Sequence, residues 1–383
     1  MYKRLLMVIL FLVILTGSAG IVNAAYNDTV NPSVHDSDSV SVINSDTTVP
    51  VRRSSDPGNN TLNVATNKTI KISFSEPIKL GSRWIELKSS AETVSIRKII
   101  SGNTLIIDPI YLLKKGSCYT IVLHSHSITD LAGNGVECYT SRFTTSIRID
   151  IVNSATGGDI TKNSLLYSYI PKTVLSDQII SRAKIGTPMI TFGNGIGPKV
   201  LIVAGVHGNE LPASAAAMKL INYLNGKTIR GTVYIIPFAI PYSTSHSLRN
   251  WNRVDPNDLA NVAGSPTNII INLAKKLQLN AVGDFHSSQP GGVPGRDSAL
   301  CTQIPTFISY RIACYIAKKS GSTLIADKIA GEKYPGALED VCNLKGIPAV
   351  TCEVLDSHGT LNYDRINKSC NQMISLLKYF LRI

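Results

Sequence analysis

Apolar and polar positions alternate in short runs over residues 61–146. In residues 69–74 the apolar positions Ile70, Ile72 and Phe74 alternate with polar ones, a period typical of a strand with one buried face. Similar runs, with Gly, Asn, Asp and Pro between them, lie at 83–87, 94–100, 104–107, 119–123 and 142–145. Many short strands separated by turn residues predict a β-sandwich.

The pattern changes to alternating strands and helices over residues 170–383. Apolar runs typical of buried strands and patterns typical of helices alternate, with strands at 199–204, 232–238, 281–285 and 348–354 and helices at 212–224, 266–277, 312–319 and 363–381. This order predicts an α/β domain with a doubly wound, mostly parallel sheet. In such a sheet the reacting groups lie beyond the carboxyl ends of the strands.

The beginning of the chain is typical of an export signal. Lys3 and Arg4 precede an apolar run over residues 5–15, and small residues follow up to Ala24. This pattern predicts a signal peptide over residues 1–24. An uncleaved N-terminal anchor is the alternative, because the run nearly reaches the length that spans a membrane. Either form predicts a secreted or cell-surface protein.

Two further segments differ in composition from the predicted domains. Residues 25–60 are rich in Ser, Asp, Asn, Thr and Pro without sustained periodicity, which predicts a flexible leader. Residues 147–169 are predicted to be a linker between the two domains. After the signal peptide, no segment is apolar enough to be expected to span a membrane.

The composition is that of a folded protein with a basic charge balance. Of the 383 residues, 44% are hydrophobic and 17% are charged, which argues against a disordered scaffold. The formal net charge is +12, but Lys and Arg are scattered, so we expect contact with an anionic envelope and none with nucleic acid. Seven cysteines leave at least one unpaired, and Cys118 with Cys138 is the candidate disulfide of the first domain.

Candidate metal ligands follow the ends of two predicted strands. His207 and Glu210 lie three residues apart after the strand at 199–204, and His286 follows the strand at 281–285. Two imidazoles and one carboxylate form the ligand set of catalytic zinc, with one position left for water. Glu353 ends a third strand and is predicted to be the general base. Asp284 is expected either to point away from the metal or to orient a ligand.

Three short sequence motifs in this domain occur together in a known superfamily. They are His-Gly-Asn-Glu at 207–210, Asp-Phe-His at 284–286 and Gly-Ile-Pro-Ala-Val-Thr-Cys-Glu at 346–353. With them the chain resembles the zinc carboxypeptidase superfamily, particularly its succinylglutamate desuccinylase/aspartoacylase branch, over nearly all of residues 170–383. The resemblance implies one zinc ion per chain and water-promoted hydrolysis of an amide or peptide bond.

The resemblance also implies residues that contact the substrate. Arg253 matches the arginine that stabilises the developing oxyanion. An Asn-Arg pair that holds a substrate carboxylate in the family is replaced here by Ala260 and Asn261, and Asn261 is left with neutral hydrogen bonds. Arg296, on a Gly/Pro loop after His286, is predicted to replace the missing arginine, with a solvated loop arginine as the alternative. Tyr334 lies where carboxypeptidases have a mobile substrate-binding tyrosine.

The first domain resembles a bacterial immunoglobulin-like domain of the surface-layer (SbsA-like) class. The matching words are Ile-Ser-Phe-Ser-Glu-Pro-Ile at 72–78, Ile-Thr-Asp-Leu-Ala-Gly-Asn at 128–134 and Arg-Phe-Thr-Thr at 142–145, and the resemblance covers about residues 50–146. This part of the chain has no catalytic constellation, so we expect a spacer or a wall-binding module.

The sequence therefore predicts an extracellular zinc metallohydrolase that acts on C–N bonds, of the carboxypeptidase or deacylase type. Its expected substrate is a peptide or an acylated amino compound, with cell-wall peptides as the leading hypothesis because of the predicted location. The alternative is a non-catalytic surface adhesion or binding protein on a zinc-peptidase fold. The retained ligands and base argue against that alternative, whereas the altered Asn-Arg pair favours it.

Overall fold

The computed structural model describes residues 46–89, 92–193, 195–227 and 229–383. The predicted signal peptide (1–24) and residues 25–45 of the predicted leader lie outside these ranges. Within them, each helix is either too short or too polar to cross a bilayer.

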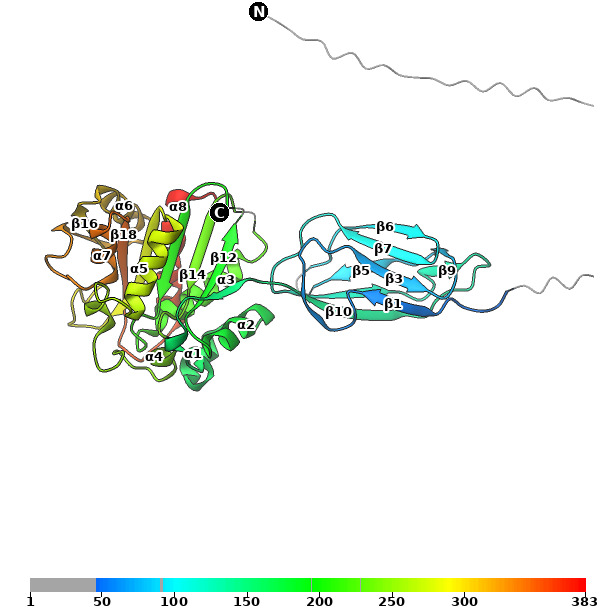
Figure 1. Cartoon of the computed structure of the whole chain (residues 1–383), viewed down its shortest axis with the longest axis horizontal. Helices are drawn as coiled ribbons and strands as arrows, with labels where there is room; N and C mark the ends of the chain where they lie inside the picture. Colours follow the sequence, from blue (N-terminus) through cyan, green and yellow to red (C-terminus); the bar gives the residue numbers. More distant parts are fainter. Residues whose placement is uncertain (1–45, 90–91, 194, 228) are drawn as a thin grey trace, which may run out of the picture. The chain divides into compact units, whose positions relative to one another are not determined.

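Strands alone build the first part of the described chain (Figure 1). They are β1 (Arg52–Asp56), β2 (Thr61–Val64), β3 (Ile70–Phe74), β4 (Ile78–Leu80), β5 (Ile85–Lys88), β6 (Ile96–Ser101), β7 (Thr104–Pro109), β8 (Cys118–Leu123), β9 (Ile128–Asp130) and β10 (Tyr139–Thr145). One four-stranded sheet has the order β1-β3-β7-β6 and another the order β2-β10-β8-β5. The pairs are antiparallel except β2 with β10. The predicted immunoglobulin-like sandwich is confirmed.

Residues 52–56 form a strand, although the sequence analysis placed them in a flexible leader (25–60). β1 pairs antiparallel with β3, so the sheet begins inside that segment. Four of the five side chains of β1 are exposed, and the strand lies at the edge of its sheet. Backbone pairing, not the burial of one apolar face, therefore holds it, and such a strand has no alternating apolar pattern to detect. In β3 the alternation is real, because Ile70, Ile72 and Phe74 are buried in the sandwich core.

An eight-stranded sheet organises the rest of the chain. Its strands are β11 (Ile149–Ile151), β12 (Pro188–Gly193), β13 (Lys199–Ala204), β14 (Thr232–Ile236), β15 (Ala281–Ser288), β16 (Ser298–Ile304), β17 (Thr323–Ile329) and β18 (Ala349–Leu355). Their order is β11-β12-β14-β13-β15-β18-β16-β17. The central strands β14, β13, β15 and β18 are parallel, as are β16 and β17, whereas β11, β12 and the β16–β18 pair are antiparallel.

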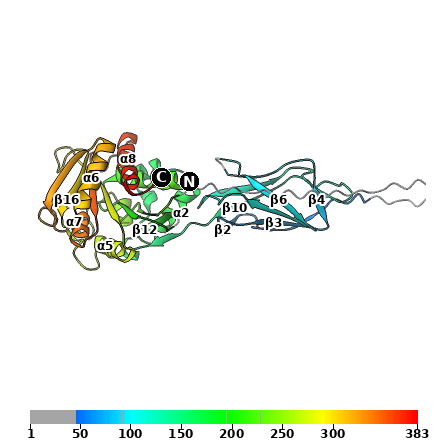
Figure 2. The same ribbon diagram turned by 90° about the horizontal axis from the view of Figure 1, so that it is seen from above.

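Helices cover both faces of this sheet (Figure 2). They are α1 (Ser164–Tyr169), α2 (Val174–Ala183), α3 (Leu211–Leu224), α4 (Pro241–Ser245), α5 (Pro266–Leu277), α6 (Phe307–Ser320), α7 (Leu338–Leu344) and α8 (Tyr363–Phe380), with short 3-10 helices at Ser154–Thr156, Ile160–Lys162 and Pro256–Asp258. In β13, Val200 and Ile202 pack toward α3, α6 and α8, whereas Leu201 and Val203 pack toward α5 and α7. This burial of successive residues on both faces confirms the doubly wound, mostly parallel α/β fold.

Two other expectations differ from the structure. The predicted linker (147–169) contains β11, which pairs with β12 in the large sheet, and also α1. All three residues of β11 are only half-buried, so the strand lacks the apolar run that marks the central strands. The candidate disulfide between Cys118 and Cys138 is not formed, and all seven cysteines are free.

Candidate metal centre

His207 and Glu210 lie in the tight connection from β13 to α3. Both are buried, with 2% and 4% of their surface exposed, and Glu210 is the residue before the first turn of α3. Between them, Gly208 packs so closely on α4 that a Cβ atom there would lie 2.1 Å from the carbonyl carbon of Ser243. The strand end thus turns both side chains inward, and the turn requires glycine.

His286 lies near the end of the neighbouring strand β15 and completes the predicted ligand set. Donor atoms of His207, Glu210 and His286 all lie within 4.8 Å of one another. The two Nδ1 atoms face the same carboxylate: His207 Nδ1 is 2.9 Å from Glu210 Oε1, and His286 Nδ1 is 2.8 Å from Glu210 Oε2. The three residues that the sequence singled out are therefore brought together in one buried cluster.

A second carboxylate stands behind each imidazole. His207 Nε2 lies 2.7 Å from Asp255 Oδ1, and His286 Nε2 lies 2.9 Å from Asp284 Oδ2. A carboxylate that accepts the Nε2 proton leaves the Nδ1 lone pair free to bind a cation, and it also fixes the ring orientation. Asp284 Oδ2 thus lies beside the Nε2 atom of a candidate ligand, in agreement with one of the two placements expected from the sequence.

The charges in the cluster stabilise one another. Burial lowers the pKa of His286, but Asp284 and Glu210 outweigh that effect and hold it well above its usual value. Burial raises the pKa of Glu210, yet His207 and His286 hold it well below its usual value. The protein thus provides a buried carboxylate that stays ionised because positive charge is close to it. A bound cation would supply that charge in place of the imidazole protons.

Glu353 lies on the strand next to His286. β15 and β18 are parallel, and His286 and Glu353 are Cα partners in their register. Burial is the main cause that raises the pKa of Glu353 to about 8, and its Oε2 atom has no hydrogen-bond partner within the described part of the chain. The predicted base therefore lies beside the candidate ligands with one carboxylate oxygen unused.

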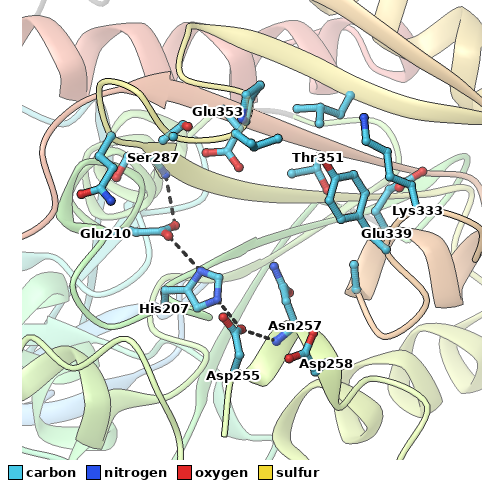
Figure 3. A pocket seen from close by; sticks show the side chains of 18 of the residues that line it. His207, Glu210, Asp255, Asn257, Asp258, Ser287, Lys333, Glu339, Thr351 and Glu353 are labelled. Carbon is cyan, nitrogen blue, oxygen red and sulfur yellow. Dashed lines mark hydrogen bonds and ion pairs between the residues drawn. The ribbon is translucent and has the colours of Figure 1, made fainter.

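These groups line one end of a cavity of about 430 Å³. Its lining includes four residues predicted from the sequence and several that were not, namely His207, Glu210, Glu353 and Tyr334 on the one hand and Arg249, Asp255, Asn257, Asp258, Asp327, Lys333, Glu339 and His358 on the other. Figure 3 shows Asp255, Asn257 and Asp258 on one wall, Glu353 and Thr351 on the opposite wall, and Lys333 and Glu339 at the far end.

Arg249 joins the metal-centre carboxylates. Its Nη1 donates a hydrogen bond of 2.9 Å to Glu210 Oε1, and its Nη2 lies 3.0 Å from Asp255 Oδ2. The guanidinium thereby bridges a candidate ligand and the carboxylate that orients His207, and part of it remains open to the cavity.

Three residues predicted to contact the substrate lie elsewhere. Arg253, Asn261 and Arg296 are exposed, and none belongs to the described lining of the cavity. Arg253 has a positive φ of 70° in a turn closed by backbone hydrogen bonds between Trp251 and Val254. Arg296 Nε donates to the carbonyl oxygen of Pro294 in its own loop. The geometry gives no support to the roles predicted for these three.

The register of this loop explains the difference. Because Asp255 is bonded to His207, the next residues that face the cavity are Asn257 and Asp258. Ala260 is fully buried, and Asn261 follows it on the outside. One signal in the sequence indicated this register: Asp followed by Pro is typical of a capped turn, and Asp255 Oδ1 does accept the backbone N–H of Asn257 at 2.9 Å.

His358 is a further residue that sequence reasoning missed. It follows the strand end that carries Glu353, so the strand-end rule could have indicated it. Its Nε2 donates to the carbonyl oxygen of Ser287 at 3.1 Å and lies 3.6 Å from Glu210 Oε1. A third imidazole thus lies at the rim of the candidate metal centre.

Comparisons with protein-family models match both parts of the chain. Residues 46–145 match the bacterial Ig-like domain, and residues 196–262 match the succinylglutamate desuccinylase/aspartoacylase catalytic domain. The second match includes His207 and Glu210 and ends before His286 and Glu353. Both resemblances stated from the sequence are thus confirmed as matches over these two stretches, in the predicted order.

Several solved structures are similar to part of the chain. A succinylglutamate desuccinylase/aspartoacylase from Rhodobacter sphaeroides is 16% identical with a TM-score of 0.40, over 52% of this chain and 61% of its own. The ectoine utilization protein EutE (DoeB) from Ruegeria pomeroyi is 17% identical with a TM-score of 0.43, over 52% and 64%. The cell shape determinant Csd4 from Helicobacter pylori, bound to a tripeptide, is 14% identical with a TM-score of 0.40, over 51% and 55%.

In each case the chain covers less than two thirds of the length of the similar structure. A search of curated proteins found no match.

Proposed function

We propose that the chain is a zinc-dependent hydrolase that cleaves an amide bond in a peptide or an acylated amino compound. One observation carries the proposal: the Nδ1 atoms of His207 and His286 face the two oxygens of Glu210, while a second carboxylate holds each Nε2. Two imidazoles and a carboxylate arranged in this way are the donors that catalytic zinc takes from a protein.

The residues present fit a zinc ion on chemical grounds. His207, Glu210 and His286 would hold it, with Asp255 and Asp284 fixing the imidazoles. In that position zinc supplies a Lewis acid that polarises the scissile carbonyl and increases the acidity of water. The buried, ionised carboxylate of Glu210 already requires positive charge beside it, which a divalent cation would provide.

Glu353 and Arg249 are proposed to carry the remaining chemistry. Glu353, with its unbonded Oε2, accepts a proton from the attacking water and returns it to the leaving nitrogen. Arg249 presents a permanently charged guanidinium to the cavity, and its N–H groups stabilise negative charge that develops on the carbonyl oxygen. Arg249 thereby takes the role that the sequence had suggested for Arg253.

The setting of the reaction is part of the proposal. The predicted signal peptide suggests an extracellular location, and the bacterial Ig-like domain and the net charge of +12 suit attachment to an anionic cell envelope. Peptides of the cell wall are therefore the first substrates to test. The second candidate is a non-catalytic binding protein, which the replacement of the family's Asn-Arg pair by Ala260 and Asn261 favours.

Turnover separates the two candidates. The zinc-loaded full-length protein is assayed on a panel of N-acyl amino acids and defined wall peptides, with free amine as the readout. Replacing Glu353 by Gln keeps the shape but removes the proton acceptor, so the rate should fall by roughly two to four orders of magnitude while zinc remains bound. A wild type that releases no amine, although it holds zinc and binds these peptides, would favour the non-catalytic protein.

A further inference from the structure

Most charges in the cavity lining are paired within the protein. Arg249 contacts both Glu210 and Asp255. At the far end, Lys333 Nζ lies 3.6 Å from Asp327 Oδ1. These contacts join each cation of the lining to an anion, so neither cation is left alone to attract a substrate carboxylate.

Glu339, also in the lining, is satisfied by its own surroundings. Its Oε1 accepts hydrogen bonds from the backbone N–H of Thr302 at 3.1 Å and from the Thr302 hydroxyl at 3.2 Å, and the amide of Asn343 donates to the same atom. Burial, reinforced by Asp340, raises the pKa of Glu339 well above its usual range. The Glu339 side chain is therefore held by hydrogen bonds within the protein, at the far end of the cavity.

Asp258 is different from these residues. It lines the cavity and is exposed, and within the described ranges no cation pairs with its carboxylate. The adjacent Asn257 lines the same wall, and its buried Oδ1 has no hydrogen-bond partner among the described residues. Asn257 and Asp258 thus lie on one wall of the cavity, and the carboxylate of Asp258 is the exposed acceptor there (Figure 3).

The scaffold of the metal centre holds this wall in place. Asp255 Oδ1, which is bonded to His207, also accepts the backbone N–H of Asn257. From the other side, Gly336 packs so tightly that a Cβ atom on it would lie 2.5 Å from the backbone carbonyl of Asp258. Asn257 and Asp258 are therefore fixed relative to the metal ligands, as a specificity site requires.

We propose that Asp258 binds a positively charged amino group of the substrate. An ammonium group has three donors and suits an unpaired carboxylate, whereas a substrate carboxylate in the same place would be repelled. The substrate class is an acylated compound with a second, free amine, such as a diamino acid within a peptide. This inference rests on the proposed zinc hydrolase and narrows its substrate.

Binding of matched hydroxamates tests the inference without turnover. The zinc-loaded protein is titrated calorimetrically with hydroxamic acids that carry a terminal ammonium, methyl or carboxylate group, with two to five methylenes between that group and the zinc-binding end. At the spacer length that binds best, the ammonium compound should bind about tenfold more tightly than the methyl compound. The carboxylate compound should bind more weakly than both.

Two substitutions locate the effect. Asp258→Asn should bring the ammonium and methyl compounds to within about twofold of each other, and Asp258→Lys should reverse the order in favour of the carboxylate, because one attractive charge is removed or inverted. The matched control is Asp177→Asn, which removes an exposed aspartate from α2 and should keep the wild-type order. Added salt should reduce the preference of the wild type, because the carboxylate is exposed.

Each outcome decides something. Zinc-loaded protein that binds the three compounds equally, or fails to bind them, would overturn the role of Asp258 while leaving the metal centre intact. A preference that survives in Asp258→Asn would overturn it as well. Protein that takes up no zinc would overturn the proposed function, and the inference that rests on it would fall too.

Discussion

At the scale of single residues, the proposed metal centre would depend on side chains that do not themselves touch zinc. Asp255 holds His207 and Asp284 holds His286, and Arg249 ties Asp255 to Glu210. Such outer partners set which imidazole nitrogen faces the metal. They are positioning residues, and their loss should be visible in metal affinity.

We expect Asp255→Asn to weaken zinc binding by about 10- to 100-fold, because the amide is a poorer acceptor for the Nε2 proton of His207. Competition with a chromophoric chelator measures the affinity. Asp159→Asn is the matched control, since Asp159 also caps a short 3-10 helix but has no histidine partner among the described residues. Equal zinc affinity of wild type and Asp255→Asn would show that Asp255 does not position the ligand.

The candidate ligands and the base could be predicted from the sequence because each lies near or just after the end of a strand with a recognisable apolar pattern. His207, Glu210, His286 and Glu353 need only the rule that strand ends meet at one edge of a parallel sheet. Arg249 lies on an irregular loop and Asp258 on a short 3-10 helix, where no periodicity indicates which side chains face the cavity. Their positions follow from one long-range hydrogen bond, between Asp255 and His207, which a sequence does not display.

At the scale of elements, burial separates the central strands that could be predicted from the edge strands that could not, although β12 and β16 were missed while mostly buried. The central strands β13 and β15 are buried along nearly their whole length, and the unbroken apolar run of β13 and the mainly apolar start of β15 were recognisable. The edge strands β11 and β17 could not be recognised from the sequence, because they are half-exposed and mix polar with apolar residues. The missed edge strand β17 carries Asp327, which lines the cavity, whereas the candidate ligands and the base lie on or beside central strands.

The turn between β13 and α3 provides a test at this scale. Gly208→Ala would place a Cβ atom 2.1 Å from the backbone of Ser243, and backbone atoms cannot move aside as a flexible side chain can. We expect the free energy of unfolding to fall by about 1–3 kcal/mol, measured by chemical denaturation. Gly58→Ala, where the new Cβ would meet atoms at an ordinary 3.4 Å, is the control. Equal free energies of unfolding for the two variants would show that the turn at Gly208 is not closely packed.

At the scale of the whole molecule, the site is assembled from segments far apart in the chain. His207 and Glu353 are separated by most of the α/β domain, and the folded sheet brings them to one edge. The net charge of +12 likewise does not describe the cavity, where an aspartate is the unpaired charge of one wall. Overall charge suggests where the protein binds, and local charge suggests what it accepts.

The central claim is that His207, Glu210 and His286 form one zinc site, and elemental analysis of the purified full-length protein tests it most directly. The structure predicts about one zinc per chain in wild type. Glu353→Gln should retain that zinc, because Glu353 is not a ligand, whereas His207→Ala and His286→Ala should each lose it and remain folded. Zinc contents that are the same in the two histidine variants as in wild type would contradict the account.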